Sequence, residues 1–87
     1  MPEISRFFGI IIKMFFNDHF PAHFHAEYGD FKAMISIENG EIIEGEMPAK
    51  QLKLIQAWII LHERELLDNF EGLRKLPVTW HTIKPLN

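Results

Sequence analysis

The sequence lacks cysteine altogether, and it contains only five glycines and five prolines among 87 residues. Without cysteine, neither a disulfide framework nor a thiolate metal site can form, and nothing requires an oxidising compartment, so we expect a cytoplasmic location. No repeat, low-complexity tract or flexible linker interrupts the chain. Because 87 residues suffice for one hydrophobic core but not for two, we expect residues 1–87 to form a single domain.

An excess of positive charge is also missing, since the formal net charge is −3 at pH 7. Proteins that coat nucleic acids usually carry clustered lysine and arginine, so that class is disfavoured, while a local patch for RNA stays open. Arg6 and Lys13 interrupt the apolar N-terminal segment, and no small-residue cleavage site follows it, which argues against a signal peptide, a membrane span and a membrane partner. A phosphate-binding glycine loop and a nucleophile elbow are absent.

What the sequence does contain is largely apolar, because 47% of its residues are hydrophobic and 13% are aromatic. The run "FFGIIIKMFF" at residues 7–16 is too continuous for one-sided alternation, so it predicts one strand that is covered on most of both faces. The purely apolar face of this strand would consist of Phe8, Ile10, Ile12, Met14 and Phe16. The polar residues "NDH" and then Pro21 predict a turn over residues 17–22.

The next segment, "HFHAEYGDFKAMISI", predicts a β-hairpin closed by Gly29 and Asp30, because glycine first in a two-residue loop suits a type II′ turn. This register places Tyr28 opposite Phe31, Ala26 opposite Ala33 and Phe24 opposite Ile35, all on one side. Glu27 would face Lys32 as a favourable charge pair. His23, His25 and Glu27 then share the other, polar side of the strand with Lys32, Met34 and Ser36.

The second half of the chain predicts a hairpin, a helix and a tail. Asn39 and Gly40 indicate a turn into the strand "EIIEGE", although a two-residue loop would set Ile35 unfavourably beside Glu44, so the register stays open. A helix should begin at Pro48 and run to about Phe70, with one apolar stripe formed by Leu52, Ile55, Trp58, Ile59, His62, Leu66 and Phe70. The tail fits a short fifth strand or an extended docking segment. The expected fold class is therefore α+β: an antiparallel four-stranded β-meander packed against one long α-helix, with a short C-terminal extension.

The stretch "HFPAHFHAE", residues 19–27, is the candidate functional site, because it contains three of the five histidines of the chain. His23 and His25, two apart on one strand, point the same way and could share a zinc ion with His19 and with an oxygen of Asp18 or Glu27. The plainer alternative is a set of exposed polar residues on an outer sheet face. We expect no cofactor, and zinc is the one metal for which the sequence offers candidate ligands.

The same residues also suit acid–base catalysis, since histidines titrate near neutral pH and can supply both a proton donor and a proton acceptor. Cleavage of RNA by its own 2′-hydroxyl needs these two roles and a cation for the phosphate, for which Lys32 is on the correct face. The candidate catalytic residues are His23 and His25, with His19 and Asp18 positioning them. His62 lies within the apolar stripe, so we interpret it as a buried histidine that hydrogen-bonds to backbone or to a carboxylate.

The alternative to an enzyme is a non-catalytic binding module. Glu38, Glu41, Glu44 and Glu46 have no basic residue among them, so the tip of the second hairpin is negative. The strand "EIIEGE" is a candidate edge strand, which could add to the sheet of a companion protein or of another copy of the chain.

One string, "DHFPAHFHAEYGDFKAMISIENGEIIEGEMP", followed at helical distance by "LHERELLDNF" and a tail with "IKPL", resembles the bacterial domain-of-unknown-function family 4160 over nearly the whole chain. The most specific part is "HFHAEYG" with Asp18 and His19 before it and with Leu61 and His62 in the helix. The family usually has a second proline where this chain has Ala22, and tryptophan where it has Phe70. Members often lie beside another small gene, so the resemblance implies one member of a toxin-antitoxin type of pair.

Overall fold

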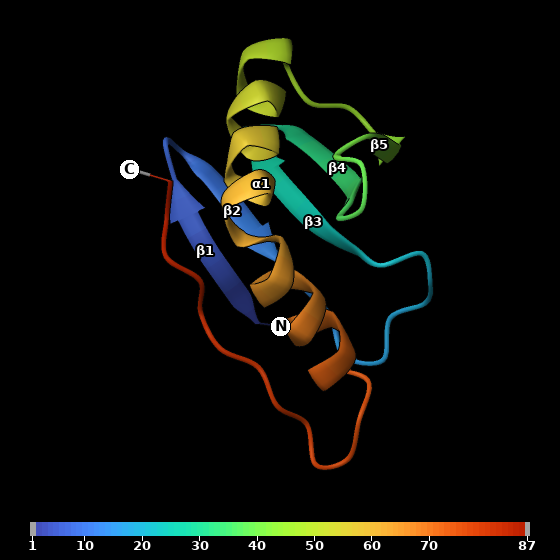
Figure 1. The fold of residues 1–87 in the computed structure, drawn as a ribbon. Helices are drawn as coiled ribbons and strands as arrows, with labels where there is room; N and C mark the ends of the chain where they lie inside the picture. Colours follow the sequence, from blue (N-terminus) through green and yellow to red (C-terminus); the bar gives the residue numbers. More distant parts are fainter. Residues whose placement is uncertain (1, 87) are drawn as a thin grey trace.

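A computed structural model describes residues 2–86 as one antiparallel sheet with one long helix (Figure 1). The sheet order is β1-β2-β3-β4-β5, so every strand pairs with its neighbour in sequence. The elements are β1 (Glu3–Phe7), β2 (Ile10–Lys13), β3 (His23–Tyr28), β4 (Phe31–Ser36), β5 (Ile42–Gly45) and α1 (Ala49–Gly72). The α+β class and the meander are confirmed, with five strands in place of four.

The extra strand comes from the N-terminal segment, where the prediction of one strand over residues 7–16 is wrong. Phe8 and Gly9 form a tight turn, with φ of 50° and 79°, and Phe7 pairs with Ile10 across it. Glycine adopts positive φ without a Cβ clash, which allows two short strands to fold back on each other here. The predicted apolar face consequently divides: Ile10, Ile12 and Met14 are buried, whereas Phe8 and Phe16 are exposed.

The hairpin of β3 and β4 has the predicted register. Tyr28 pairs with Phe31, Ala26 with Ala33, and Phe24 with Ile35; the last two pairs are buried in the core, whereas Phe31 is exposed. Glu27 does stand opposite Lys32. Its ion pair, however, is with Lys13 on β2, at 3.2 Å, and not with Lys32. The strand face that carries His25 is therefore the face turned away from α1.

The hairpin of β4 and β5 is present, but its loop is longer than two residues. Ile35 pairs with Ile42 and Met34 with Glu44, with a register shift between them, so the unfavourable contact of Ile35 with Glu44 is avoided. Gly45 has φ of 91°, and an added Cβ would lie 2.2 Å from the backbone oxygen of Lys32. Glycine is therefore required at this end of β5.

Helix α1 crosses one face of the sheet and buries most of its predicted stripe. Ile55, Trp58, Ile59, Leu66 and Phe70 are buried, while Leu52 and His62 are half-buried. The helix is kinked at His62, whose φ and ψ are −129° and 22°. No helix in residues 2–86 is both long enough and apolar enough to cross a membrane.

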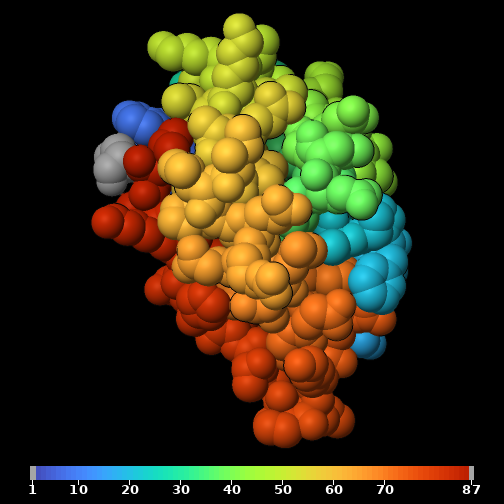
Figure 2. Space-filling model, in the orientation of Figure 1, coloured from blue at the N-terminus to red at the C-terminus, as the bar shows by residue number. Residues whose placement is uncertain are grey.

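The tail after α1 is an extended docking segment and forms no strand within the described residues. It runs back along β1 and lies beside the helix, as Figures 1 and 2 show. Hydrogen bonds hold its backbone along its length: the Ile83 N–H donates to the Ile4 carbonyl, the Trp58 indole donates to the Lys84 carbonyl, and Asn69 exchanges two hydrogen bonds with the backbone of His81. The tail thereby completes the core at the β1 edge.

Candidate functional site

Three side chains that can bind a cation or a proton meet where β3 begins. Asp18 lies in the loop of residues 14–22 between β2 and β3, and His23 and His25 are the first and third residues of β3. One oxygen of Asp18, Oδ2, is 2.9 Å from Nε2 of His23 and 3.3 Å from Nε2 of His25. The two imidazole centroids are 5.2 Å apart. We call these three residues the Asp18 cluster.

His23 is the buried member, with a side chain that is 0% exposed. Its Nδ1 lies 2.7 Å from the carbonyl oxygen of Pro21, and because a carbonyl can only accept, Nδ1 must carry a hydrogen. The opposite atom, Nε2, is buried and has no aligned hydrogen-bond partner, although Asp18 is close. The plainer alternative, in which the histidines are simply exposed on the outer face, is therefore wrong for His23.

Asp18 is held as a carboxylate by its neighbours. Partial burial favours the neutral acid and raises its pKa, but the hydrogen bond from His25, the positive charge that His23 can carry and the backbone N–H of His19 together lower the pKa below its usual value. The side chain is 17% exposed, so solvent screens these contacts only in part. Negative charge is thus concentrated between the two rings.

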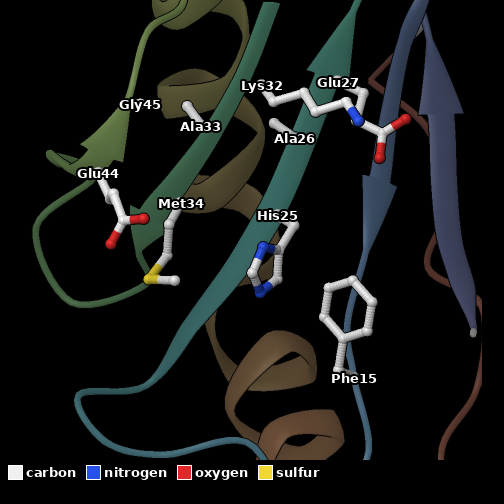
Figure 3. A pocket seen from close by; sticks show the side chains of 9 residues that line it. All are labelled: Phe15, His25, Ala26, Glu27, Lys32, Ala33, Met34, Glu44 and Gly45. Carbon is white, nitrogen blue, oxygen red and sulfur yellow. The ribbon is translucent and has the colours of Figure 1, made fainter.

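His25 is the member of the cluster that reaches an open surface. Its side chain is 27% exposed, and the ring of Phe15 packs against it edge to face at 4.3 Å between centroids. It borders a hollow of about 340 Å³ on the sheet face away from α1, shown in Figure 3. The hollow is lined by Phe15, His25, Ala26, Glu27, Lys32, Ala33, Met34, Glu44 and Gly45. A ligand there would touch His25 and could meet the Lys32 side chain.

The arrangement of this strand and loop, with "HFHAEYG" at its centre, is encoded in a segment that a family model matches. That model, described as Domain of unknown function (DUF4160), matches residues 9–71. The chain belongs to the DUF4160 family. No curated protein and no solved structure matches it significantly.

The segment that matches DUF4160 includes the whole Asp18 cluster and nearly all of α1. The family description states no activity. The tail from residue 73 onward lies outside the matched segment, although the Leu73 carbonyl accepts a hydrogen bond of 3.0 Å from the backbone N–H of Asn17, the residue before Asp18.

The other predicted histidines of this DUF4160 chain lie in two different places. His19 stays near the cluster, with Nδ1 3.3 Å from the second oxygen of Asp18, but its side chain is 74% exposed. His62 is remote from the cluster and contacts the carboxylate of Glu65 at 2.6 Å, which matches the expected carboxylate partner. Because α1 covers the opposite face of the sheet, His62 cannot converge with His25.

From the sequence we expected Asp18 only to position the histidines, whereas in the structure its carboxylate lies between His23 and His25 and contacts both. It also missed two aromatic neighbours: Phe15 beside His25, and Phe70, whose ring is 5.8 Å from that of His23. The register between β2 and β3, with Lys13 opposite His25, would have indicated Phe15 as a neighbour of the cluster. No local signal in the sequence points from Phe70 to His23.

Proposed function

We propose that this protein acts on RNA as the toxin-like member of a toxin-antitoxin type of pair, with the Asp18 cluster and His19 as its active site. The observation that carries the proposal is the position of Asp18, whose two oxygens face three histidine rings: Oδ2 faces His23 and His25, and Oδ1 faces His19. Two of these rings are accessible to a substrate, and one is not.

The exposed fractions of the histidine side chains indicate which histidines act on the substrate and which one positions them. Cleavage of RNA by its own 2′-hydroxyl requires one group that accepts a proton and a second that donates one to the leaving oxygen. His25 and His19 are the accessible pair, with side chains 27% and 74% exposed, and each is within 3.3 Å of a different Asp18 oxygen. His23 is fully buried, so it acts as a positioning residue. Lys32, in the hollow beside His25, is the cation for the phosphate.

Growth of a bacterial culture tests this function most directly. Induction of the protein alone should arrest growth, and His25→Ala should relieve the arrest. His81→Ala is the matched control, because the His81 side chain is 54% exposed and lies outside the cluster, 3.7 Å from Glu65. Both variants are first shown by urea denaturation to be fully folded under the conditions of the growth assay. Arrest that persists in His25→Ala, or no arrest from the wild type, contradicts the toxin-like role.

The chemistry has its own test with purified protein and RNA. Attack by the 2′-hydroxyl leaves a 2′,3′-cyclic phosphate and a 5′-hydroxyl, so the products should carry these ends. A DNA oligonucleotide of the same sequence should stay intact, because it has no 2′-hydroxyl. Products with 5′-phosphate ends would contradict the proposed roles of His25 and His19.

A second candidate function rests on the edge of the sheet. β5 is an edge strand, Ile43 within it is 44% exposed, and Glu38, Glu41, Glu44 and Glu46 around it are all exposed. A non-catalytic module could pair through this edge with a basic companion protein or with another copy of the chain. Sedimentation equilibrium of the wild type beside Ile43→Lys tests the second case: a dimer that the substitution abolishes supports it, and a monomer at all concentrations excludes it.

A further inference from the structure

We propose that Asp18, His23 and His25 bind a divalent transition-metal ion of the zinc class. Each residue presents one ligand atom, a carboxylate oxygen or a ring nitrogen, and these three atoms lie within 4.8 Å of one another. The inference concerns binding only, so it holds or fails independently of the action on RNA.

The separations suit one ion. Zinc bonds of about 2.0–2.1 Å at tetrahedral angles place neighbouring ligand atoms about 3.3 Å apart. The distances from Asp18 Oδ2 to the two Nε2 atoms are 2.9 Å and 3.3 Å. Small side-chain rotations would therefore admit the ion without a change in the backbone.

The buried histidine supplies an independent observation that points to a cation. Nε2 of His23 is buried, has no hydrogen-bond partner and lies beside a carboxylate. A lone pair facing a carboxylate away from water is costly unless a positive group lies between them. A proton on Nε2 would supply that positive group through an ion pair alone, whereas a metal ion would supply it with a direct bond to each of the two atoms.

The second nitrogen of His23 is arranged as it is in metal sites. Histidines that bind metals almost always donate their other N–H to a carboxylate, a backbone carbonyl or water, which fixes the tautomer. Nδ1 of His23 does so to the Pro21 carbonyl at 2.7 Å, and this leaves the Nε2 lone pair free for an ion.

The donor set and the exposure define the class of ion. Two imidazoles and one carboxylate, without a thiolate, suit zinc and its first-row neighbours, whereas magnesium and calcium prefer oxygen ligands alone. His25 is partly exposed, so the fourth position faces the open side. An ion with three protein ligands and one open position is exchangeable and can bind a further ligand. Its bond to His25 would use the lone pair that proton transfer needs, so the metal should inhibit cleavage of RNA.

Isothermal titration of the untagged, metal-free full chain with zinc chloride tests the site. We expect one ion per chain, a loss of affinity of at least about 100-fold in Asp18→Asn and in His25→Ala, and no change in His81→Ala. No stoichiometric uptake by the wild type, or uptake that both cluster variants retain, would overturn the proposal.

Nitrogen NMR of the wild-type histidine rings keeps the test decisive if a variant fails to fold. Addition of zinc should shift the Nε2 resonances of His23 and His25, while those of His62 and His81 stay in place. Shifts confined to His62 and His81 would reject the site. Growth arrest without zinc binding, or zinc binding without growth arrest, would separate this inference from the proposed function.

Discussion

Replacement of Asp18 by asparagine should destabilise the metal-free protein, because it removes the negative charge of the carboxylate at the centre of the cluster. Asparagine is similar in size and can still accept the backbone N–H of His19, which lies 3.1 Å from Oδ1. What it loses is the charge-assisted contact with His25 at 3.3 Å. A hydrogen bond to a charged group contributes about 1.5–3 kcal/mol. Since the His25 contact is long and Asp18 is 17% exposed, we expect a loss of about 1–2 kcal/mol.

The pH dependence of this loss follows from the lowered pKa of Asp18. A carboxylate whose pKa is lower in the folded state contributes stability above its unfolded pKa, and that contribution disappears as the pH falls through the folded pKa. The wild type and Asp18→Asn should therefore differ in unfolding free energy at pH 7, and the difference should shrink below pH 3.8, the ordinary value of the group.

Urea denaturation in the presence of EDTA measures this difference without interference from metal. Asp30→Asn is the matched control, because Asp30 is an exposed residue in the turn between β3 and β4. The free energy of unfolding of Asp30→Asn should equal that of the wild type at pH 7 and at pH 2. Equal stability of Asp18→Asn and wild type at pH 7, or a difference that persists unchanged at pH 2, would refute the reasoning.

Three further outcomes are expected. Asn69→Ala should lose about 1–3 kcal/mol in urea denaturation, because it removes two hydrogen bonds to the backbone of His81 that fix the tail; an unchanged urea midpoint would contradict this. Gly45→Ala should cost more than Gly29→Ala in the same assay, since a Cβ at Gly45 would lie 2.2 Å from backbone whereas none is near Gly29; the reverse order would contradict it. Zinc at 100 times its dissociation constant should stabilise the fold by about 2.7 kcal/mol, measured by thermal unfolding with and without EDTA.

The parts of the fold that follow from local pairing could be predicted from the sequence. The register of β3 and β4 follows from a glycine turn and from alternating apolar pairs, and α1 follows from one apolar stripe after Pro48. The turn at Phe8 and Gly9 could not be predicted in the same way, because it lies inside an apolar run without the polar residues that usually mark a turn.

In the candidate site, too, the features set by local pattern could be predicted and those set by distant contacts could not. The shared direction of His23 and His25 follows from strand alternation, so the sequence could bring these two side chains together. The burial of His23 depends on the path of the loop and on Phe70 from the end of α1, and these are contacts between distant segments. The central position of Asp18 depends on the same loop, whose path no local pattern determines.

A purely structural role for the Asp18 cluster would account for only part of it. Asp18 and the buried His23 could tie the loop to β3 by themselves, and the Pro21 carbonyl already fixes the ring of His23. His25 contributes to such a tie only through one contact with Asp18, which is 3.3 Å long, and its side chain is partly exposed. Its second imidazole is instead placed where a bound ion or a substrate in the hollow can reach it. Loss of function in a His25→Ala variant that is still fully folded under the assay conditions is therefore the result that separates a chemical role from a structural one.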